Sequence, residues 1–271
     1  MTVLFAVGRD GISSLVLKRY AEILTPTLTF LCNLSFETGI FPAEFKLAEI
    51  IPIHKNGCRD RVTNFRPISI LTSFSKILER CINTRIITFL EKNCLLSNSQ
   101  FGFRSQKSTS DAVLELTNFI VTNMDSKRKV LAVFLDLAKA FDTVSVPLLI
   151  GKLERLGLRG TPLNLLTDYL TNRYQRVRVD NFVSEDLLGD RGIPQGSILG
   201  STLFLTYVND LCDLQLKNGK IIAFADDTAL LFSVNSWDKV YESAQSELNS
   251  VSLWLTKNEI NAFLDLGKSQ N

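Results

Sequence analysis

Phe224-Ala225-Asp226-Asp227-Thr228 is the stretch from which the rest of the chain is best interpreted. An apolar run over residues 221–224 leads into the two aspartates, and a second over residues 229–232 leads out of them. Both runs are short and rich in branched or aromatic residues, which predicts a β-hairpin with two carboxylates at its tip. Because adjacent like charges repel, we expect a hard divalent cation such as Mg²⁺ to bind there. A solvated acidic turn is the alternative interpretation of this stretch taken alone.

Length and composition are those of an ordinary globular protein. The chain has 271 residues, of which 45% are hydrophobic and 21% charged, so it can bury a sizeable core as one large domain or two intimate subdomains. The net charge of +2 neither requires nor excludes a polyanionic partner. Arg173, Arg176 and Arg178 form one basic cluster and residues 127–129 another, and a solvated face is the alternative interpretation of both.

Cysteine and histidine usage excludes several classes of site. The five cysteines are scattered without a Cys-x-x-Cys pair, which fits reduced thiols of an intracellular protein better than a disulfide framework or a zinc site. His54 is the only histidine, which excludes a histidine-rich metal site and argues against a Ser-His-Asp triad. No apolar run approaches the length of a membrane span, so we expect no membrane partner.

Residue patterns predict alternating helices and strands. The second predicted helix starts with Thr25 as N-cap and Pro26 as its first residue, and Gly39 ends it. Strands are predicted over residues 47–53, 130–135 and 174–179. Helices are predicted over residues 13–24, 26–38, 73–90, 111–123, 147–156, 161–170, 198–208 and 236–255.

The run at residues 130–135 is continuously apolar, as expected of a strand buried on both faces, and it delivers Asp136 at its end. Together with Asp226 and Asp227, this residue gives three carboxylates on neighbouring strands, which can hold two divalent metals for phosphoryl transfer. No histidine base is required, because a metal can activate the attacking hydroxyl. The alternative for Asp136 alone is the N-cap of a helix over residues 137–141.

Five stretches, taken in order, resemble the motifs of reverse transcriptases. FLDLAKAFD (residues 134–142), GIPQGSILG (192–200) and FADD (224–227) are similar to the three palm motifs. NFRPIS (64–69) and QFGFR (100–104) are similar to motifs of the fingers. Their order and their residues resemble those of non-LTR (LINE-type, jockey-like) retrotransposon polymerases over about residues 10–268. Group II intron reverse transcriptases share several of these boxes.

The resemblance implies an α/β (α+β) right-hand polymerase fold, in which an antiparallel palm sheet packs on helices. Residues 1–271 would be a partial reverse transcriptase domain, with fingers over 1–125 and palm over 126–271. The thumb that follows the palm in the family is missing, so we expect a fragment, a degraded element copy or a partial gene model.

The resemblance also assigns roles to the carboxylates and to an aromatic ring. Asp136, Asp226 and Asp227 would be the catalytic residues and would bind two Mg²⁺ ions, or Mn²⁺ in their place. Phe141, five residues after Asp136, would be a steric gate that crowds a ribose 2′-OH and so selects deoxynucleotides. A core phenylalanine is the alternative interpretation of Phe141.

The remaining assigned residues would bind the incoming nucleotide. Gln195 and Gly196 would line the nascent base-pair pocket, where glycine allows close backbone approach. Arg66 and Arg104 would approach the triphosphate, since guanidinium binds phosphate in a bidentate manner, with a structural ion pair as the alternative for both. Lys268 would lie near the leaving phosphates.

The expected function is RNA-directed DNA synthesis from a 3′-OH primer, with an RNA template, a DNA primer and dNTPs as partners. The family implies an intracellular protein, present in nucleus and cytoplasm as a ribonucleoprotein. Two positions depart from the family pattern, Ser201 in place of proline and Asp265 in place of asparagine, and neither alters the three carboxylates. The alternatives are a catalytically inactive relic, a nucleic-acid-binding fragment without chemistry, and an intron-encoded maturase-type reverse transcriptase.

Overall fold

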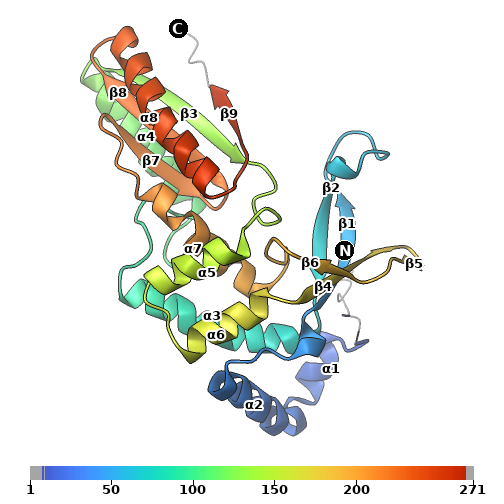
Figure 1. The fold of residues 1–271 in the computed structure, drawn as a ribbon. Helices are drawn as coiled ribbons and strands as arrows, with labels where there is room; N and C mark the ends of the chain where they lie inside the picture. The colour runs from blue at the N-terminus through green and yellow to red at the C-terminus, as the bar shows by residue number, and fades with distance from the viewer. Residues whose placement is uncertain (1–7, 9, 267–271) are drawn as a thin grey trace. The chain divides into compact units, whose positions relative to one another are not determined.

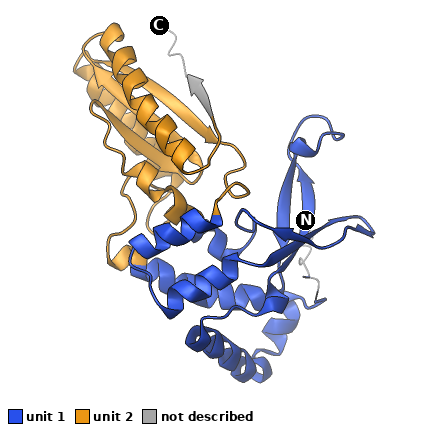
Figure 2. Ribbon diagram, viewed as in Figure 1, with its two compact units in different colours: residues 1–89, 146–203 blue, residues 90–145, 204–271 orange. Residues whose placement is uncertain are grey.

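The computed structural model of the chain describes residue 8 and residues 10–266. It divides into two compact units, each formed by two stretches of the chain (Figure 2): unit 1 comprises residues 1–89 and 146–203, and unit 2 comprises residues 90–145 and 204–271. The predicted boundary at residue 125 concerned functional subdomains, which a division by compactness does not test. Within the described part of the chain, no helix is both long and apolar enough to cross a membrane.

The first helical region of unit 1 breaks at Tyr20, not at Thr25 as predicted. Helix α1 spans Ser14–Arg19 and α2 spans Ala21–Thr38, so Pro26 lies inside a helix. The Thr25 hydroxyl donates to the Ala21 carbonyl, a bond typical of a helix interior, and so does not cap a new helix. The predicted end is confirmed: Gly39 has φ +70° and its N–H donates to the Ser35 carbonyl.

The sheet of unit 1 is mixed. Strand β1 (Leu47–His54) pairs antiparallel with β2 (Phe65–Ile70) and parallel with β4 (Arg173–Val179). The short strands β5 (Phe182–Val183) and β6 (Leu187–Gly189) pair with β4. The unit also contains the larger part of α3 (Ser73–Lys92), α5 (Val146–Arg155), α6 (Thr161–Leu170), the start of α7 (Ile198–Cys212), and the short helices η1 (Ala43–Phe45) and η2 (Val62–Asn64).

The arginine cluster of β4 is engaged within unit 1. Arg176 and Arg178 both form ion pairs with the buried carboxylate of Glu49, at 3.3 and 2.6 Å. Arg173 is itself buried and donates to the Tyr169 carbonyl at 3.0 Å. The cluster therefore fastens β4 to β1 and α6, and the interpretation as a solvated face was wrong for Arg173.

The sheet of unit 2 is antiparallel throughout, in the order β7–β8–β3–β9 (Figure 1). Helices α4 (Thr109–Asp125) and α8 (Trp237–Lys257) pack against it. A buried cluster joins Ala112 of α4 to Ile222, Ala229 and Leu231 of the sheet, and burial of each large side chain contributes about 1.5–3 kcal/mol. The strands are β3 (Lys129–Leu137), β7 (Gly219–Phe224), β8 (Asp227–Val234) and β9 (Ala262–Leu266).

Strand β3 is not buried on both faces, which corrects the prediction. Val133 and Leu135 on one face are completely or almost completely buried, whereas Phe134 on the other face is 44% exposed and Asp136 is exposed. The α4 cluster reaches Ala132 on that second face but does not include Phe134. One face of β3 is therefore exposed to solvent from Phe134 onward, and Asp136 of the candidate site lies on this exposed face.

Candidate active site

The acidic hairpin is present, but its tip lies one residue earlier than predicted. Phe224 and Asp227 are the last paired residues of β7 and β8, so the two-residue loop is Ala225-Asp226. Ala225 is buried and has φ +58°, a left-handed conformation that costs a residue with a side chain roughly 1–2 kcal/mol. The two aspartates therefore differ in position: Asp226 lies in the loop and Asp227 begins β8.

Asp136 and Asp227 stand directly opposite each other in the β3–β8 register. Burial raises the pKa of the Asp227 carboxyl, and the negative charges of Asp226 and Asp136 raise it further. The three carboxylates thus interact through their charges, an arrangement that a bound cation would relieve. Among the described residues, however, no three His, Cys, Asp or Glu side chains are gathered closely enough to form a ready-made metal cluster.

The interpretation of Asp136 as a helix N-cap was wrong. Asp136 lies within β3, and the residues that follow Leu137 form turns. The Ala138 N–H donates to the Asn261 carbonyl at 2.9 Å, so the backbone continues beside the chain that leads into β9. This pairing holds the end of β3 in the sheet, with Asp136 facing the same side as Phe134.

Phe141 lies in an aromatic group within unit 2. Its ring stacks on Phe204 at a centroid distance of 4.8 Å and meets Phe103 edge-on at 6.4 Å. Phe141 is partly exposed and Phe103 is half-exposed, so the group has both a buried and an open side. The ring is therefore packed in part, as the core interpretation requires, and the steric-gate role stays a prediction.

Residues 99–102 pack directly against the acidic turn. The Phe101 N–H donates to the Ala223 carbonyl, and the Ala223 N–H donates to the Ser99 carbonyl, both at 2.8 Å. The Gln100 side chain, 2% exposed, accepts from the Ala225 N–H at 2.9 Å and donates to the Ala225 carbonyl at 3.3 Å. Sequence reasoning placed Gln100 in the QFGFR stretch but gave it no role of its own, because its partner Ala225 lies 125 residues away.

Arg104 forms an ion pair within unit 2. Its guanidinium donates to both oxygens of Glu91, at 2.6 and 3.0 Å, and to the Ser97 carbonyl at 2.6 Å. The Arg104 hydrogen bonds lower the pKa of the Glu91 carboxyl. The structural alternative that the sequence left open for Arg104 is therefore the arrangement observed, and contact with a triphosphate stays untested.

Three other predicted nucleotide-binding residues, Arg66, Gln195 and Gly196, belong to unit 1. Arg66 lies in β2 with an exposed side chain. The Gln195 carbonyl accepts from the Ser69 N–H at 2.7 Å. This bond holds the loop Pro194-Gln195-Gly196 (the PQG loop) against β2. Gly196 has φ +113°, and a Cβ atom there would lie 2.9 Å from the Ser69 carbonyl oxygen, so glycine is required. Lys268 lies outside the described residues.

A buried carboxylate holds the start of α7, directly after the PQG loop. One oxygen of Glu79, a completely buried residue of α3, accepts from the N–H groups of Ile198 and Leu199 at 2.7 and 3.3 Å. The other oxygen accepts from the Ser75 hydroxyl at 3.0 Å. Burial raises the pKa of Glu79, although these hydrogen bonds and the charge of Arg173 act in the opposite direction. Local sequence patterns could not reveal this cap either, since it comes from another helix.

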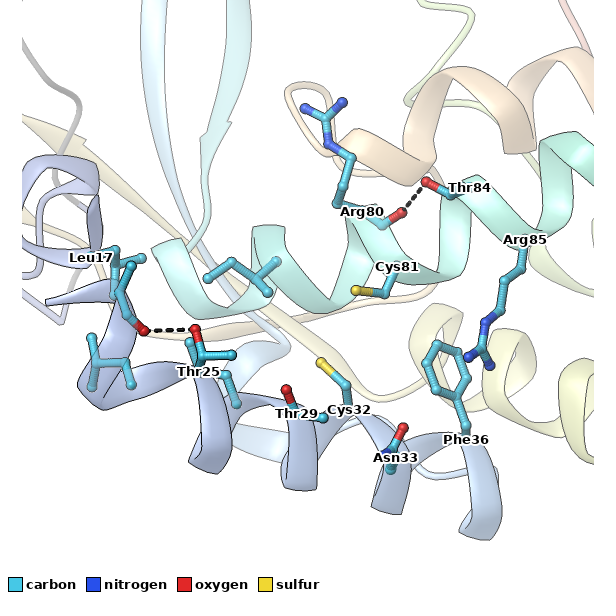
Figure 3. Close-up of a pocket in the computed structure, with 14 residues that line it drawn as sticks. Leu17, Thr25, Thr29, Cys32, Asn33, Phe36, Arg80, Cys81, Thr84 and Arg85 are labelled. Atoms are coloured by element: carbon cyan, nitrogen blue, oxygen red, sulfur yellow. Dashed lines mark hydrogen bonds between the residues drawn. The ribbon is translucent and has the colours of Figure 1, made fainter. Parts of the chain in front are cut away.

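A cavity of about 570 Å³ in unit 1 lies between α2 and α3. Figure 3 shows the thiols of Cys32 and Cys81 facing each other there, and the Arg85 guanidinium lies over the Phe36 ring at 3.7 Å. Burial and the neighbouring Cys81 raise the pKa of Cys32 to about 11. A thiol with so high a pKa is protonated and weakly nucleophilic at neutral pH, so Cys32 is a poor candidate for a catalytic nucleophile.

Comparison with known sequences matches the chain to reverse transcriptases. The family described as "Reverse transcriptase (RNA-dependent DNA polymerase)" matches residues 53–269. The chain is 33% identical to the probable RNA-directed DNA polymerase from transposon BS of Drosophila melanogaster, over 91% of this chain and 28% of that protein. It is 31% identical to the polymerase from mobile element jockey of the same organism, over 92% and 28%. The chain therefore spans less than a third of the length of these relatives.

Comparison with solved structures supports the same fold at low sequence identity. Telomerase from Candida albicans, in complex with a fragment of telomeric RNA, matches 96% of this chain and 48% of that chain with a TM-score of 0.62 at 13% identity. A C-terminally truncated apo telomerase from Candida tropicalis matches 86% and 52% with a TM-score of 0.56 at 12% identity. The mixed α/β fold is thus that of telomerase structures. Since the family match covers most of the chain, the chain belongs to the reverse transcriptase family, and it is similar to RNA-directed DNA polymerases of mobile elements.

Proposed function

We propose that this chain carries the catalytic part of a non-LTR retrotransposon polymerase, which copies RNA into DNA from the 3′-OH of a DNA primer. The observation that carries the proposal is the register of β3 and β8, in which Asp136 faces Asp227 with Asp226 in the adjoining loop. Family membership implies a divalent metal and a nucleic-acid template and primer. In this proposal residues 1–125 are the fingers and residues 126–271 the palm.

Asp136, Asp226 and Asp227 would hold two Mg²⁺ ions, or Mn²⁺. Their oxygens are the ligand type that these cations prefer, and the mutual repulsion that raises the Asp227 pKa is what cation binding would relieve. Bound there, the metals would activate the primer hydroxyl and stabilise the leaving phosphates. The exposed end of β3, beyond the α4 cluster, leaves Asp136 open to a primer terminus.

The remaining residues would place the incoming dNTP. Phe141 would crowd a ribose 2′-OH, and Gln195 and Gly196 would line the base-pair pocket. Arg66 is the better candidate for the triphosphate contact, because its side chain is exposed whereas that of Arg104 is engaged by Glu91. Lys268 would lie near the leaving phosphates. If Phe141 is the gate, Phe141→Ala should raise incorporation of rNTPs relative to dNTPs at matched concentrations, and an unchanged ratio would make it a core residue.

The test of function is metal-dependent incorporation of dNTPs on a primed RNA template. Asp136→Asn and Asp226→Asn should each abolish incorporation while the far-UV circular dichroism spectrum is unchanged, because loss of a metal ligand raises the barrier by several kcal/mol. Asp125→Asn, which changes an exposed aspartate at the end of α4, is the matched control and should retain activity. Full synthesis by purified Asp136→Asn would refute the assignment.

The same assay separates the proposed function from its alternatives. Binding of primed RNA without incorporation would indicate an inactive relic or a binding fragment. The transposon relatives favour a retrotransposon polymerase over an intron-encoded maturase, and neighbouring genomic sequence with an endonuclease reading frame would support that choice. For the retrotransposon protein we propose a ribonucleoprotein present in nucleus and cytoplasm.

A further inference from the structure

We propose that Gln100 is a positioning residue: its side-chain amide holds the left-handed turn at Ala225 and thereby sets Asp226 and Asp227 in register with Asp136. This inference rests on the proposed function of the three carboxylates. Gln100 would contact neither metal nor substrate and would act only through the backbone of the turn. Gln100 is the first residue of the QFGFR stretch, which resembles a motif of the fingers.

The Gln100 side chain binds the backbone of Ala225 through both its oxygen and its nitrogen. The side-chain oxygen of Gln100 accepts from two N–H groups, those of Ala225 at 2.9 Å and Gly102 at 2.8 Å. Its side-chain nitrogen donates to the Ala225 carbonyl at 3.3 Å. Both backbone groups of Ala225 are therefore bound by one side chain, which needs a donor and an acceptor in the same planar group. A glutamine amide provides both without a charge, whereas a glutamate carboxylate is an acceptor only.

This contact maintains a left-handed conformation at Ala225. Ala225 has φ +58° and is 6% exposed, and the turn brings two aspartates together beside a third. Backbone strain and like-charge repulsion both act to open such a turn. Two hydrogen bonds from a buried side chain oppose this opening and leave the carboxylates themselves free to bind a cation.

Close packing of Gly102 against Ala225 keeps Gln100 beside the turn. A Cβ atom added at Gly102 would lie 2.2 Å from the Ala225 nitrogen, so residue 102 must be glycine for the loop to approach the turn. The backbone bonds of Ser99 and Phe101 to Ala223 flank Gln100 on either side. The loop therefore forms a clamp on the turn, with Gln100 at its centre.

Hydrogen exchange tests the clamp without reference to catalysis. In the metal-free 271-residue chain, Gln100→Met keeps the side-chain length and removes both hydrogen-bonding groups. By NMR, exchange of the Ala225 amide should accelerate by roughly tenfold, the change that corresponds to one lost hydrogen bond, while amides in the middle of β8 keep their protection. Gln106→Met changes an exposed glutamine of the same loop and should leave exchange at Ala225 unaltered.

Binding of Mn²⁺, measured by electron paramagnetic resonance, tests the positioning role. Gln100→Met should weaken Mn²⁺ binding by roughly 10- to 100-fold, as is typical when residues that orient metal ligands are removed. Adding Ala225→Gly to this variant should restore part of the affinity, because glycine adopts the left-handed turn without strain. The double variant also serves if Gln100→Met alone fails to fold. Gln106→Met should bind Mn²⁺ as the wild type does.

The outcomes separate the inference from the proposed function. Unchanged exchange at Ala225 in Gln100→Met overturns the clamp, and faster exchange with unchanged Mn²⁺ affinity overturns the positioning role. If the wild-type chain binds no Mn²⁺ that Asp136→Asn or Asp226→Asn abolishes, the proposed function fails, whatever the exchange result. Faster exchange together with weaker, glycine-rescued Mn²⁺ binding supports the inference.

Discussion

The turn at Ala225 in unit 2 and the start of α7 in unit 1 are each held by one buried side chain, but by different chemistry. Gln100 meets a backbone segment that presents both a donor and an acceptor, the N–H and the carbonyl of Ala225. Glu79 meets donors only, the N–H groups of Ile198 and Leu199 and the hydroxyl of Ser75. The groups to be satisfied thus select an amide in one motif and a carboxylate in the other.

Charge makes the same distinction. The turn held by Gln100 carries Asp226 and Asp227, so a second negative charge there would add to an existing repulsion. Glu79 lies at a helix N-terminus and is influenced by Arg173, both of which favour a negative charge. The neutral side chain occurs where the fold already gathers carboxylates, and the ionisable one where positive partners are available.

The largest effect on stability is expected when the amide and the carboxylate are exchanged between the two positions. Gln100→Glu would set a carboxylate oxygen against the Ala225 carbonyl and should lower the free energy of unfolding by about 3 kcal/mol. Glu79→Gln keeps an acceptor for the Ile198 N–H, so it should change the free energy of unfolding by less than about 1 kcal/mol. Urea unfolding of both variants measures the difference, and equal losses would contradict the explanation by donors and acceptors.

Glycine substitutions should give a smaller effect and test how tightly the two loops pack. Gly102→Ala should lower the free energy of unfolding by about 2 kcal/mol, since its Cβ atom would overlap the backbone of Ala225. Gly196→Ala should also destabilise, through its clash with Ser69 and its positive φ. Gly151→Ala is the control: it lies in α5 with open space around it and should be neutral or stabilising by up to about 1 kcal/mol. A loss at position 151 as large as at 102 would show that packing is not the cause.

The smallest of the expected effects is a difference in the pH dependence of stability between variants at Glu79 and variants at Gln100. The folded-state pKa of Glu79 is raised by burial, so between the unfolded value of about 4.3 and that raised value the folded state binds more protons. Stability of the wild type should therefore fall, through this group, as pH rises across that window. Glu79→Gln removes the group, so its stability relative to wild type should increase with pH. Gln100→Met should show no such trend, and a flat difference for Glu79→Gln would mean that its pKa is not raised.

Sequence patterns predicted the elements that depend on local signals. The helix over Thr161–Leu170 was placed at its observed bounds, directly after Gly160. The break near residue 20 was misplaced because Thr25 and Pro26 imitate a helix start. In the structure, Thr25 instead binds the carbonyl of Ala21 within a continuing helix. A capping pattern alone does not distinguish these two outcomes.

The candidate site was predictable only where its chemistry appears in the residue types. Asp136, Asp226 and Asp227 stand out because buried strands seldom end in carboxylates without a reason. The roles of Gln100 and Glu79 were not predictable, because their partners lie 125 and about 120 residues away in the sequence. Arg104 was open to two interpretations, since only the fold brings Glu91 to it.

The last described strand has a consequence for how the protein behaves at high concentration. Strand β9 covers the side of β3 that would otherwise be an open edge, from Val133 to Leu137. An uncovered edge with a run of apolar residues recruits strands from other molecules and seeds aggregation. A version of the chain shortened before residue 262 should therefore precipitate or form oligomers through β3, and Asp136 would be buried in that contact. The five residues of β9 thus close this edge of the strand that carries Asp136.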